Sequence, residues 1–132
     1  KMIMNMSLGG PFDINGYDVP DEDNDDHPDL VDDVFSYATK NNDVLIIVAA
    51  GNESCGIGGS CEIYGDTYSE AYYYPCSYEN VLCVAATIHE DKLAGFSNRE
   101  ASVGLAAPGY QIISSMPETE SSYDYYSGTR RL

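Results

Sequence analysis

The stretch Val44-Leu45-Ile46-Ile47-Val48-Ala49-Ala50, followed directly by Gly51-Asn52, decides the fold class of this chain. It is a continuous apolar run rich in branched side chains, and turn-forming residues bound it on both sides. A run this short and this uniformly apolar is typical of a strand in a parallel sheet, where both faces of the strand are buried. The sequence therefore predicts a buried strand over residues 44–50 that ends abruptly at Gly51.

Other short apolar runs predict further strands of the same kind. They cover residues 2–8, 81–87, 103–107 and Ile112–Ser115. A helix is predicted between the first of these strands and residues 44–50. Pro28 suits its first turn, and Asn41-Asn42 provides the stop. Its apolar face is expected to contain Leu30, Val31, Val34, Phe35 and Ala38. Strand, helix and strand form a right-handed crossover, so the fold class is α/β with a mostly parallel sheet and flanking helices.

Two segments do not fit this alternation, and both are expected to be loops. Residues 11–28 are polar and acidic and contain Gly16 and Pro20, so they predict a surface loop. Residues 53–74 form a long Gly-, Ser- and Tyr-rich excursion that contains two of the cysteines. Residues 1–132 are taken as one partial domain with a modest core. No apolar run approaches the roughly 20 residues of a membrane helix, so membrane insertion is not expected.

The charge balance excludes nucleic acid as a partner. Six basic and 22 acidic residues give a net charge of −16, and a chain of this charge repels nucleic acid. The acidity is uneven: nine of the 22 acidic residues lie between Asp18 and Asp33, in a stretch that includes Asp21-Glu22-Asp23-Asn24-Asp25-Asp26. These oxygens are suited to Ca²⁺, but they lack the EF-hand pattern, and a solvated acidic loop is the favoured interpretation. No metal-ligating residues are assigned, and a calcium-dependent interaction domain stays an alternative.

The four cysteines are Cys55, Cys61, Cys76 and Cys83, and sequence alone leaves their three complete pairings open. Cys55 and Cys61 flank a Gly-rich loop, so a local disulfide between them is plausible. Cys83 lies inside an apolar run and is expected to be a buried free thiol. The spacing of the four does not favour a zinc site.

Polar and glycine-rich segments follow the predicted strands, at the edge of the sheet where α/β proteins collect function. Asn52 ends the strand over residues 44–50. Taken alone, Gly51-Asn52 is an ordinary turn. A side-chain amide held rigidly at such a position also has the chemistry to stabilise the oxyanion of an acyl transfer.

The order of several segments supports the second interpretation. They are Asn5-Met6-Ser7-Leu8-Gly9-Gly10, Ile47-Val48-Ala49-Ala50-Gly51-Asn52-Glu53, Phe96-Ser97-Asn98, Ala107-Pro108-Gly109 and Ser127-Gly128-Thr129. In this order they resemble the later half of a subtilisin-like serine protease catalytic domain. The resemblance implies a three-layer α/β architecture, here incomplete, and an endopeptidase that works through an acyl-enzyme and requires no cofactor.

The resemblance also implies roles for individual residues. Asn52 corresponds to the oxyanion-hole asparagine. Ser7, Leu8 and Gly9 correspond to the strand that pairs with the substrate backbone. Ala49, Ala50 and Gly51 correspond to one wall of the primary specificity pocket, where their small size leaves room for a large side chain. The implied partners are an extended peptide or protein substrate and a propeptide or inhibitor. A structural Ca²⁺ is compatible with the family, and a secretory-pathway location is expected from the resemblance and the cysteines.

The resemblance fails at the catalytic triad. The family nucleophile, a serine, should follow Thr129, but position 130 is Arg, which has no nucleophilic oxygen. The triad Asp and His have no counterpart, and His27 and His89 are expected to be surface residues. These 132 residues alone are therefore predicted to be inactive. The start at Lys1 favours a truncated domain with an exposed sheet edge and a tendency to aggregate. A non-catalytic pseudoprotease that binds peptides is the alternative.

Overall fold

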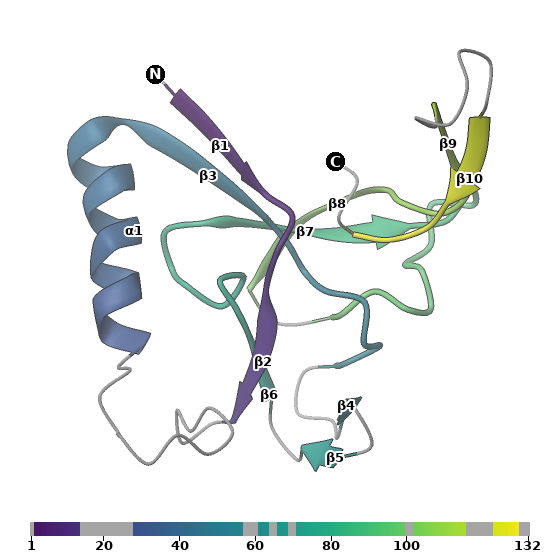
Figure 1. Ribbon diagram of the computed structural model, residues 1–132, viewed down its shortest axis with the longest axis horizontal. Coiled ribbons are helices and arrows are strands. Elements are labelled where there is room, and N and C mark those ends of the chain that lie inside the picture. The colour runs from purple at the N-terminus through teal and green to yellow at the C-terminus, as the bar shows by residue number, and fades with distance from the viewer. Residues whose placement is uncertain are drawn as a thin grey trace.

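The fold is built around one parallel sheet (Figure 1). The structure is a computed structural model that describes residues 2–13, 28–56, 61–63, 66–68, 71–99, 102–115 and 123–129. The sheet has the strand order β1-β3-β7-β8. Its strands are β1 (Met2–Met6), β3 (Val44–Ala49), β7 (Leu82–Thr87) and β8 (Val103–Pro108). All three neighbouring pairs are parallel, which confirms the predicted α/β class with a parallel sheet.

Helix α1 (Pro28–Asn42) precedes β3 in the chain and packs against it (Figure 1). It ends where predicted, because Asp43 adopts a positive φ of 53°, the left-handed conformation that commonly follows a helix. Phe35 and Ala38 pack against the core, as expected from the sequence. The prediction for Val34 is wrong, since 60% of this residue is exposed. The packed face is rotated toward Phe35 and Thr39, so Val34 lies beside it rather than on it.

The two predicted loops contain short antiparallel pairs. Strand β2 (Gly10–Asp13) pairs with β6 (Ala71–Tyr74), so the predicted surface loop over residues 11–28 begins as a strand. Residues 14–27, with the acidic run and His27, lie outside the described residues. The cysteine-containing excursion includes β4 (Cys61–Ile63) and β5 (Asp66–Tyr68), which pair with each other. A separate hairpin joins β9 (Ile112–Ser115) to β10 (Tyr123–Tyr126).

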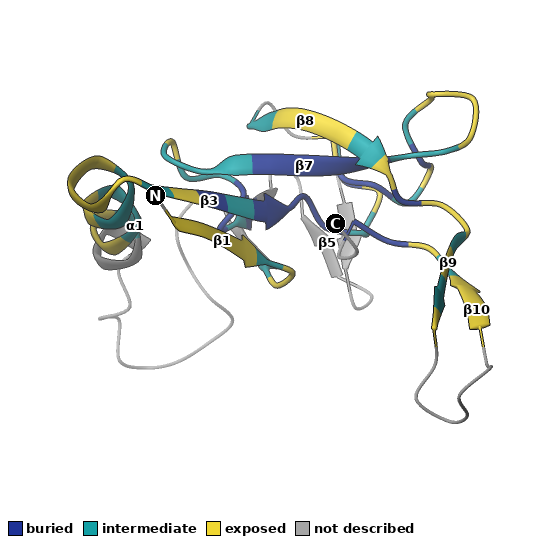
Figure 2. Ribbon diagram, turned by 90° about the horizontal axis from the view of Figure 1, so that it is seen from above, coloured by how far each residue is buried: buried dark blue, intermediate teal, exposed yellow. Residues whose placement is uncertain are grey.

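The core lies between β3, β7 and the residues around Tyr73. The outer strands β1 and β8 are largely exposed (Figure 2). Among the described residues, the side chains that cluster in the core are Ile46, Val48, Ala50, Tyr73, Cys76, Cys83 and Ala85. On the outer strands, Met2 and Ile3 of β1 and Leu105 of β8 are each more than half exposed, at 61%, 69% and 52%. The exposed apolar edge expected from the sequence is therefore present.

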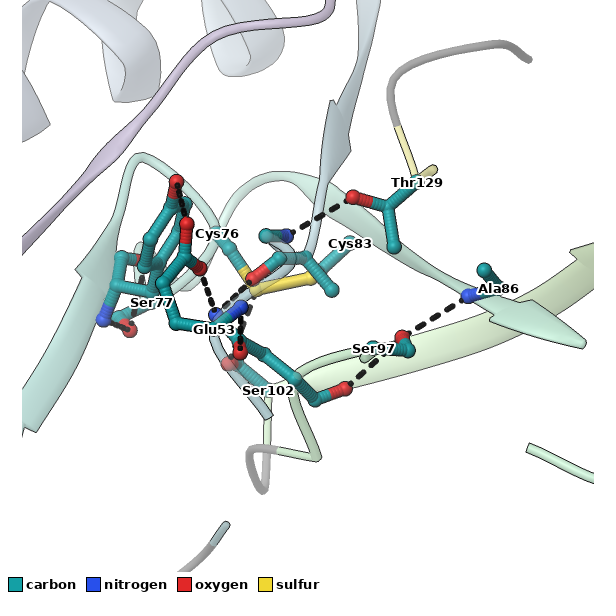
Figure 3. Close-up of a disulfide and its surroundings, with 12 residues drawn as sticks. Glu53, Cys76, Ser77, Cys83, Ala86, Ser97, Ser102 and Thr129 are labelled. Carbon is teal, nitrogen blue, oxygen red and sulfur yellow. Dashed lines mark hydrogen bonds between the residues drawn. A yellow bond between two sulfur atoms is a disulfide. The ribbon is translucent and has the colours of Figure 1, made fainter. Parts of the chain in front are cut away.

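The prediction that Cys83 is a free thiol is wrong. Cys83 is bonded to Cys76, and both are fully buried (Figure 3). The turn after β6 brings Cys76 to within 5.0 Å of Cys83, measured between Cα atoms. A buried thiol and a buried half-cystine have the same apolar surroundings, so the run around Cys83 did not distinguish them. Cys55 is also disulfide-bonded. The predicted Cys55–Cys61 pairing involves a side chain outside the described ones.

Candidate active site

Four loops meet at the carboxyl ends of the parallel strands. The end of β3 is held to β7 by a bond from the Ala50 amide to the Val84 carbonyl, at 3.0 Å. The end of β8 is held in the same way, because the Gly109 amide donates to Thr87. Gly109 then accepts a 2.8 Å bond from the Gly128 amide. This chain of backbone bonds brings the segment after β10 next to the end of β3, although the two are far apart in sequence.

Asn52 is held by Thr129 through its side-chain oxygen. Asn52 Oδ1 accepts a bond of 2.9 Å from the Thr129 amide and one of 3.0 Å from the Thr129 hydroxyl. The same hydroxyl accepts from the Gly51 amide at 3.1 Å, and only 2% of Thr129 is exposed (Figure 3). Among the described residues, no acceptor is bonded to Asn52 Nδ2. The side-chain amide is thus fixed at its oxygen end while its two N–H donors remain available.

The backbone of Asn52 is held from the opposite side by Glu53. The carboxylate oxygen Oε2 of Glu53 accepts from the Asn52 amide at 2.7 Å and from Asn98 Nδ2 at 2.8 Å. Its other oxygen, Oε1, lies 3.4 Å from the Tyr73 hydroxyl. Oε2 therefore has two hydrogen-bond donors, whereas Oε1 shares the single proton of the Tyr73 hydroxyl with the Gly9 carbonyl, which lies closer at 3.1 Å.

Asn98 is the centre of this network. It is fully buried, and its side-chain oxygen accepts from the amides of Glu53 and Cys55, both at 3.0 Å. Its side-chain nitrogen donates to the Ala50 carbonyl at 3.0 Å as well as to Glu53. Its own backbone amide donates to Gly51. Both donors and both acceptor positions of the asparagine side chain are used, so few other side chains would fit here.

Ser97 fixes the segment that carries Asn98. Its hydroxyl accepts from the Ala86 amide on β7 at 3.0 Å and donates to the Asn98 carbonyl at 3.2 Å (Figure 3). Sequence analysis noted the Phe96-Ser97-Asn98 segment only for its position in the order of motifs. Ser97 and Asn98 are fully buried, which indicates a structural role. The sequence did not reveal this role, because burial of a polar residue is not visible in it.

The residues predicted to bind substrate lie at the ends of two neighbouring strands, β1 and β3. Ser7 and Leu8 follow β1 and are exposed, with Leu8 54% exposed. On the neighbouring strand, Ala49 and Ala50 are 6% and 0% exposed, and Gly51 is buried as well. The ring of Tyr73 lies close to Gly51, because a Cβ atom added to this glycine would be 2.7 Å from Tyr73 Cζ. Tyr73 was one of several tyrosines in a predicted loop, and packing of that loop was favoured over a substrate-facing role for their rings.

The remaining predicted features are only partly described. Within the described ranges, no three His, Cys, Asp or Glu side chains group as metal ligands, and the acidic run lies outside these ranges. His89 is exposed and lies edge-on to Tyr110, as expected for a surface histidine. Arg130 lies outside the described residues. Over the part of the chain that the structure describes, no helix has the length and apolar character needed to cross a membrane.

Bacterial serine proteases are similar in sequence to this chain. The major intracellular serine protease of Bacillus subtilis is 34% identical over 127 residues, which cover 96% of this chain and 32% of that protein. The extracellular basic protease of Dichelobacter nodosus is 38% identical over 96 residues, or 69% of this chain and 14% of the relative. The chain thus spans about a third or less of these relatives, which include both intracellular and extracellular enzymes.

Solved structures support the same fold. The prenylagaramide maturation protease PagA aligns with a TM-score of 0.66 and 26% identity, over 97% of this chain and 38% of PagA. A lanthipeptide protease aligns with a TM-score of 0.73 over 97% of this chain and 42% of that protease; at 16% identity, it supports the fold alone. The family model described as the subtilase family matches residues 1–129. This chain belongs to the subtilase family of subtilisin-like serine proteases.

Proposed function

We propose that this chain provides the oxyanion-hole asparagine and part of the substrate cleft of a subtilisin-like serine endopeptidase. In this role the Asn52 side-chain amide donates a hydrogen bond to the oxyanion that forms when a serine attacks the scissile carbonyl. A donor that is fixed before the reaction stabilises this charge without reorganisation during the step.

The observation that carries the proposal is the pair of bonds from Thr129 to Asn52 Oδ1. The Thr129 backbone amide can only donate, so the Asn52 atom facing it must be the oxygen. The nitrogen of Asn52 is consequently on the other branch of the side chain, where no described residue accepts its hydrogens. A simple turn asparagine has no need of two long-range bonds that fix which way its amide faces.

The proposed substrate is an extended peptide or protein segment. Ser7 and Leu8 are exposed at the end of edge strand β1, and an extended peptide can add to such an edge through backbone hydrogen bonds. A propeptide or protein inhibitor that presents the same extended backbone would occupy the same edge. The polypeptide backbone gives such binding its affinity, so we expect the side-chain preference to come from the residues beside Gly51.

Replacement of Asn52 by alanine tests the proposal in the complete gene product. We expect kcat for a peptide substrate to fall about 10²- to 10³-fold with little change in KM, the effect of removing an oxyanion-hole donor in subtilisin. The measurement is steady-state hydrolysis of a chromogenic peptide at matched concentrations of folded protein. Asn41→Ala, at an exposed position near the end of α1, is the matched control and should retain full activity. An unchanged kcat for Asn52→Ala would refute the role.

A second prediction concerns the 132 residues produced alone. Thr129 is followed by Arg130, and no segment provides the family's triad Asp and His, so no group can form an acyl-enzyme. We expect no labelling by a fluorophosphonate probe, whereas a gene product with a complete triad should be labelled. Labelling of the 132-residue chain at any serine above the level of heat-denatured protein would contradict this.

Arg130 also favours a second candidate function. If arginine occupies the nucleophile position in the complete gene product, the proposed cleft binds extended peptides without cutting them. Binding of a peptide by calorimetry, in a gene product that no fluorophosphonate labels, would support this pseudoprotease and exclude the endopeptidase.

We propose a secretory-pathway location for the gene product, supported by the disulfide between Cys76 and Cys83. Disulfides persist in oxidising compartments and are rare in the cytosol. The structural Ca²⁺ stays a prediction, since the acidic run that suggested it lies outside the described residues. Detection of both cysteines as free thiols in protein isolated under alkylating conditions would argue against secretion.

A further inference from the structure

We propose that Tyr73 closes the primary specificity pocket, so that the protease cleaves after small residues such as glycine, alanine and serine. The inference rests on the proposed function, because it assigns the substrate class of the same cleft. It follows from the position of one aromatic ring between the two strand ends that are expected to contact substrate.

The ring of Tyr73 fills the space beside both glycines at these strand ends. A Cβ atom added to Gly9 would lie 2.7 Å from Cε1 of Tyr73, and one added to Gly51 would lie 2.7 Å from its Cζ. Real Cβ atoms do not approach other atoms this closely, so neither position can accept even a methyl group. A substrate side chain directed between Gly9 and Gly51 would meet the same ring.

The described residues around the ring are buried, so they enclose no solvent-filled space among themselves. Tyr73 is 3% exposed, and Ala49 and Ala50 of the opposing wall are 6% and 0% exposed. In an open pocket without a ligand, the side chains that line it would be in contact with water. Here the ring packs against backbone and is part of the hydrophobic core.

Polar contacts hold the ring in place. The Tyr73 hydroxyl lies 3.1 Å from the Gly9 carbonyl and 3.4 Å from Glu53 Oε1. The backbone is fixed as well, because the Tyr73 amide donates to Ser77 Oγ at 3.2 Å and its carbonyl accepts from the Ser77 amide at 2.9 Å. A large substrate side chain would have to displace a ring that is buried and bonded at its far end.

These contacts also argue against a preference for basic side chains. Glu53 is the carboxylate next to the ring, but its Oε2 already accepts from Asn52 and Asn98, and its Oε1 lies 3.4 Å from the Tyr73 hydroxyl. The ring stands between this carboxylate and the space beside Gly9. Glu53 therefore positions Tyr73 and Asn52, and it is not presented to a lysine or arginine of the substrate.

The test compares peptide substrates that differ only in the residue before the cleaved bond, using the complete gene product. We expect kcat/KM to be at least about 100-fold higher for alanine than for phenylalanine at this position, since a pocket of fixed size discriminates by shape. Tyr73→Ala should lower this ratio at least about 10-fold, while Tyr73→Phe, which keeps the ring, should leave it within about 2-fold of wild type.

Both values of kcat/KM are measured on the same protein preparation. Partial unfolding of a variant lowers both equally and does not change their ratio. Tyr78→Ala removes a neighbouring aromatic residue that contacts Phe35 and Tyr74, and it should leave the ratio unchanged. If Tyr73→Ala does not fold, the ratio of kcat/KM for alanine and phenylalanine in the wild type alone tests the inference. Equal cleavage after alanine and phenylalanine would overturn the inference and leave the proposed function intact. Failure to hydrolyse any peptide would overturn the proposed function and this inference together.

Discussion

Substitution of Gly51 by alanine is expected to destabilise the complete gene product by about 3–5 kcal/mol, the sum of backbone strain and overpacking. Gly51 has a φ of 100°, a conformation that residues with a side chain rarely adopt. Its missing Cβ would lie 2.3 Å from Asn98 Nδ2, 2.6 Å from Glu53 Oε2 and 2.7 Å from Tyr73 Cζ. None of these three atoms is free to move, since each takes part in the buried network around Asn52.

This loss is large compared with the roughly 5–15 kcal/mol that stabilises a typical protein, so it is measurable as a lower melting temperature and a lower soluble yield. Gly95→Ala is the matched control, because an added Cβ there meets nothing within 4 Å. Chemical denaturation of the two variants side by side should show a loss for Gly51→Ala only. Equal stability of both variants would mean that the space beside Gly51 is open, which would also contradict the position assigned to Tyr73.

The helix and the strands of the parallel sheet could be predicted because each has a local signal, whereas the short strands β2, β4, β5, β6 and β10 were not predicted. The branched run before Gly51 gave β3 to within one residue, and Pro28 and Asn42 gave the limits of α1. Apolar periodicity does not show where the buried face of a helix ends, however. Val34 was therefore predicted to lie on the buried face of α1, although it is exposed. These successes and errors depend only on residues within one helix or strand.

The contacts that shape the site could not be predicted, because they join residues far apart in sequence. Thr129 reaches Asn52 across 77 residues, and Tyr73 reaches Gly9 across 64. No local pattern distinguishes Tyr73 from the other tyrosines of its segment. The Cys76–Cys83 bond was missed for a related reason, since only the turn after β6 brings the two thiols together. The family resemblance placed Asn52, but it carried no information on what this chain packs around it.

The second large effect is expected for Asn98→Ala, which should lower the free energy of unfolding by about 3–6 kcal/mol. The substitution leaves the amides of Glu53 and Cys55 and the carbonyl of Ala50 without their partners. A buried group that loses its partner costs about 1–3 kcal/mol. Asn80→Ala is the matched control: this asparagine makes one bond to Ser36 Oγ, so about 1 kcal/mol is expected for its loss.

Asn98→Ala is also expected to lower activity in the fraction that remains folded. Asn98 positions Glu53, and the Glu53 carboxylate accepts from the backbone amide of Asn52. In the alanine variant the backbone of Asn52 is therefore held less firmly, while Thr129 still holds its side chain. The result should be a fall in kcat smaller than that of Asn52→Ala, with KM nearly unchanged. Active-site titration at a temperature well below the melting transition separates this effect from unfolding. A variant with reduced stability but unchanged kcat per active site would show that Asn98 supports the fold alone, and that Thr129 is sufficient to orient Asn52.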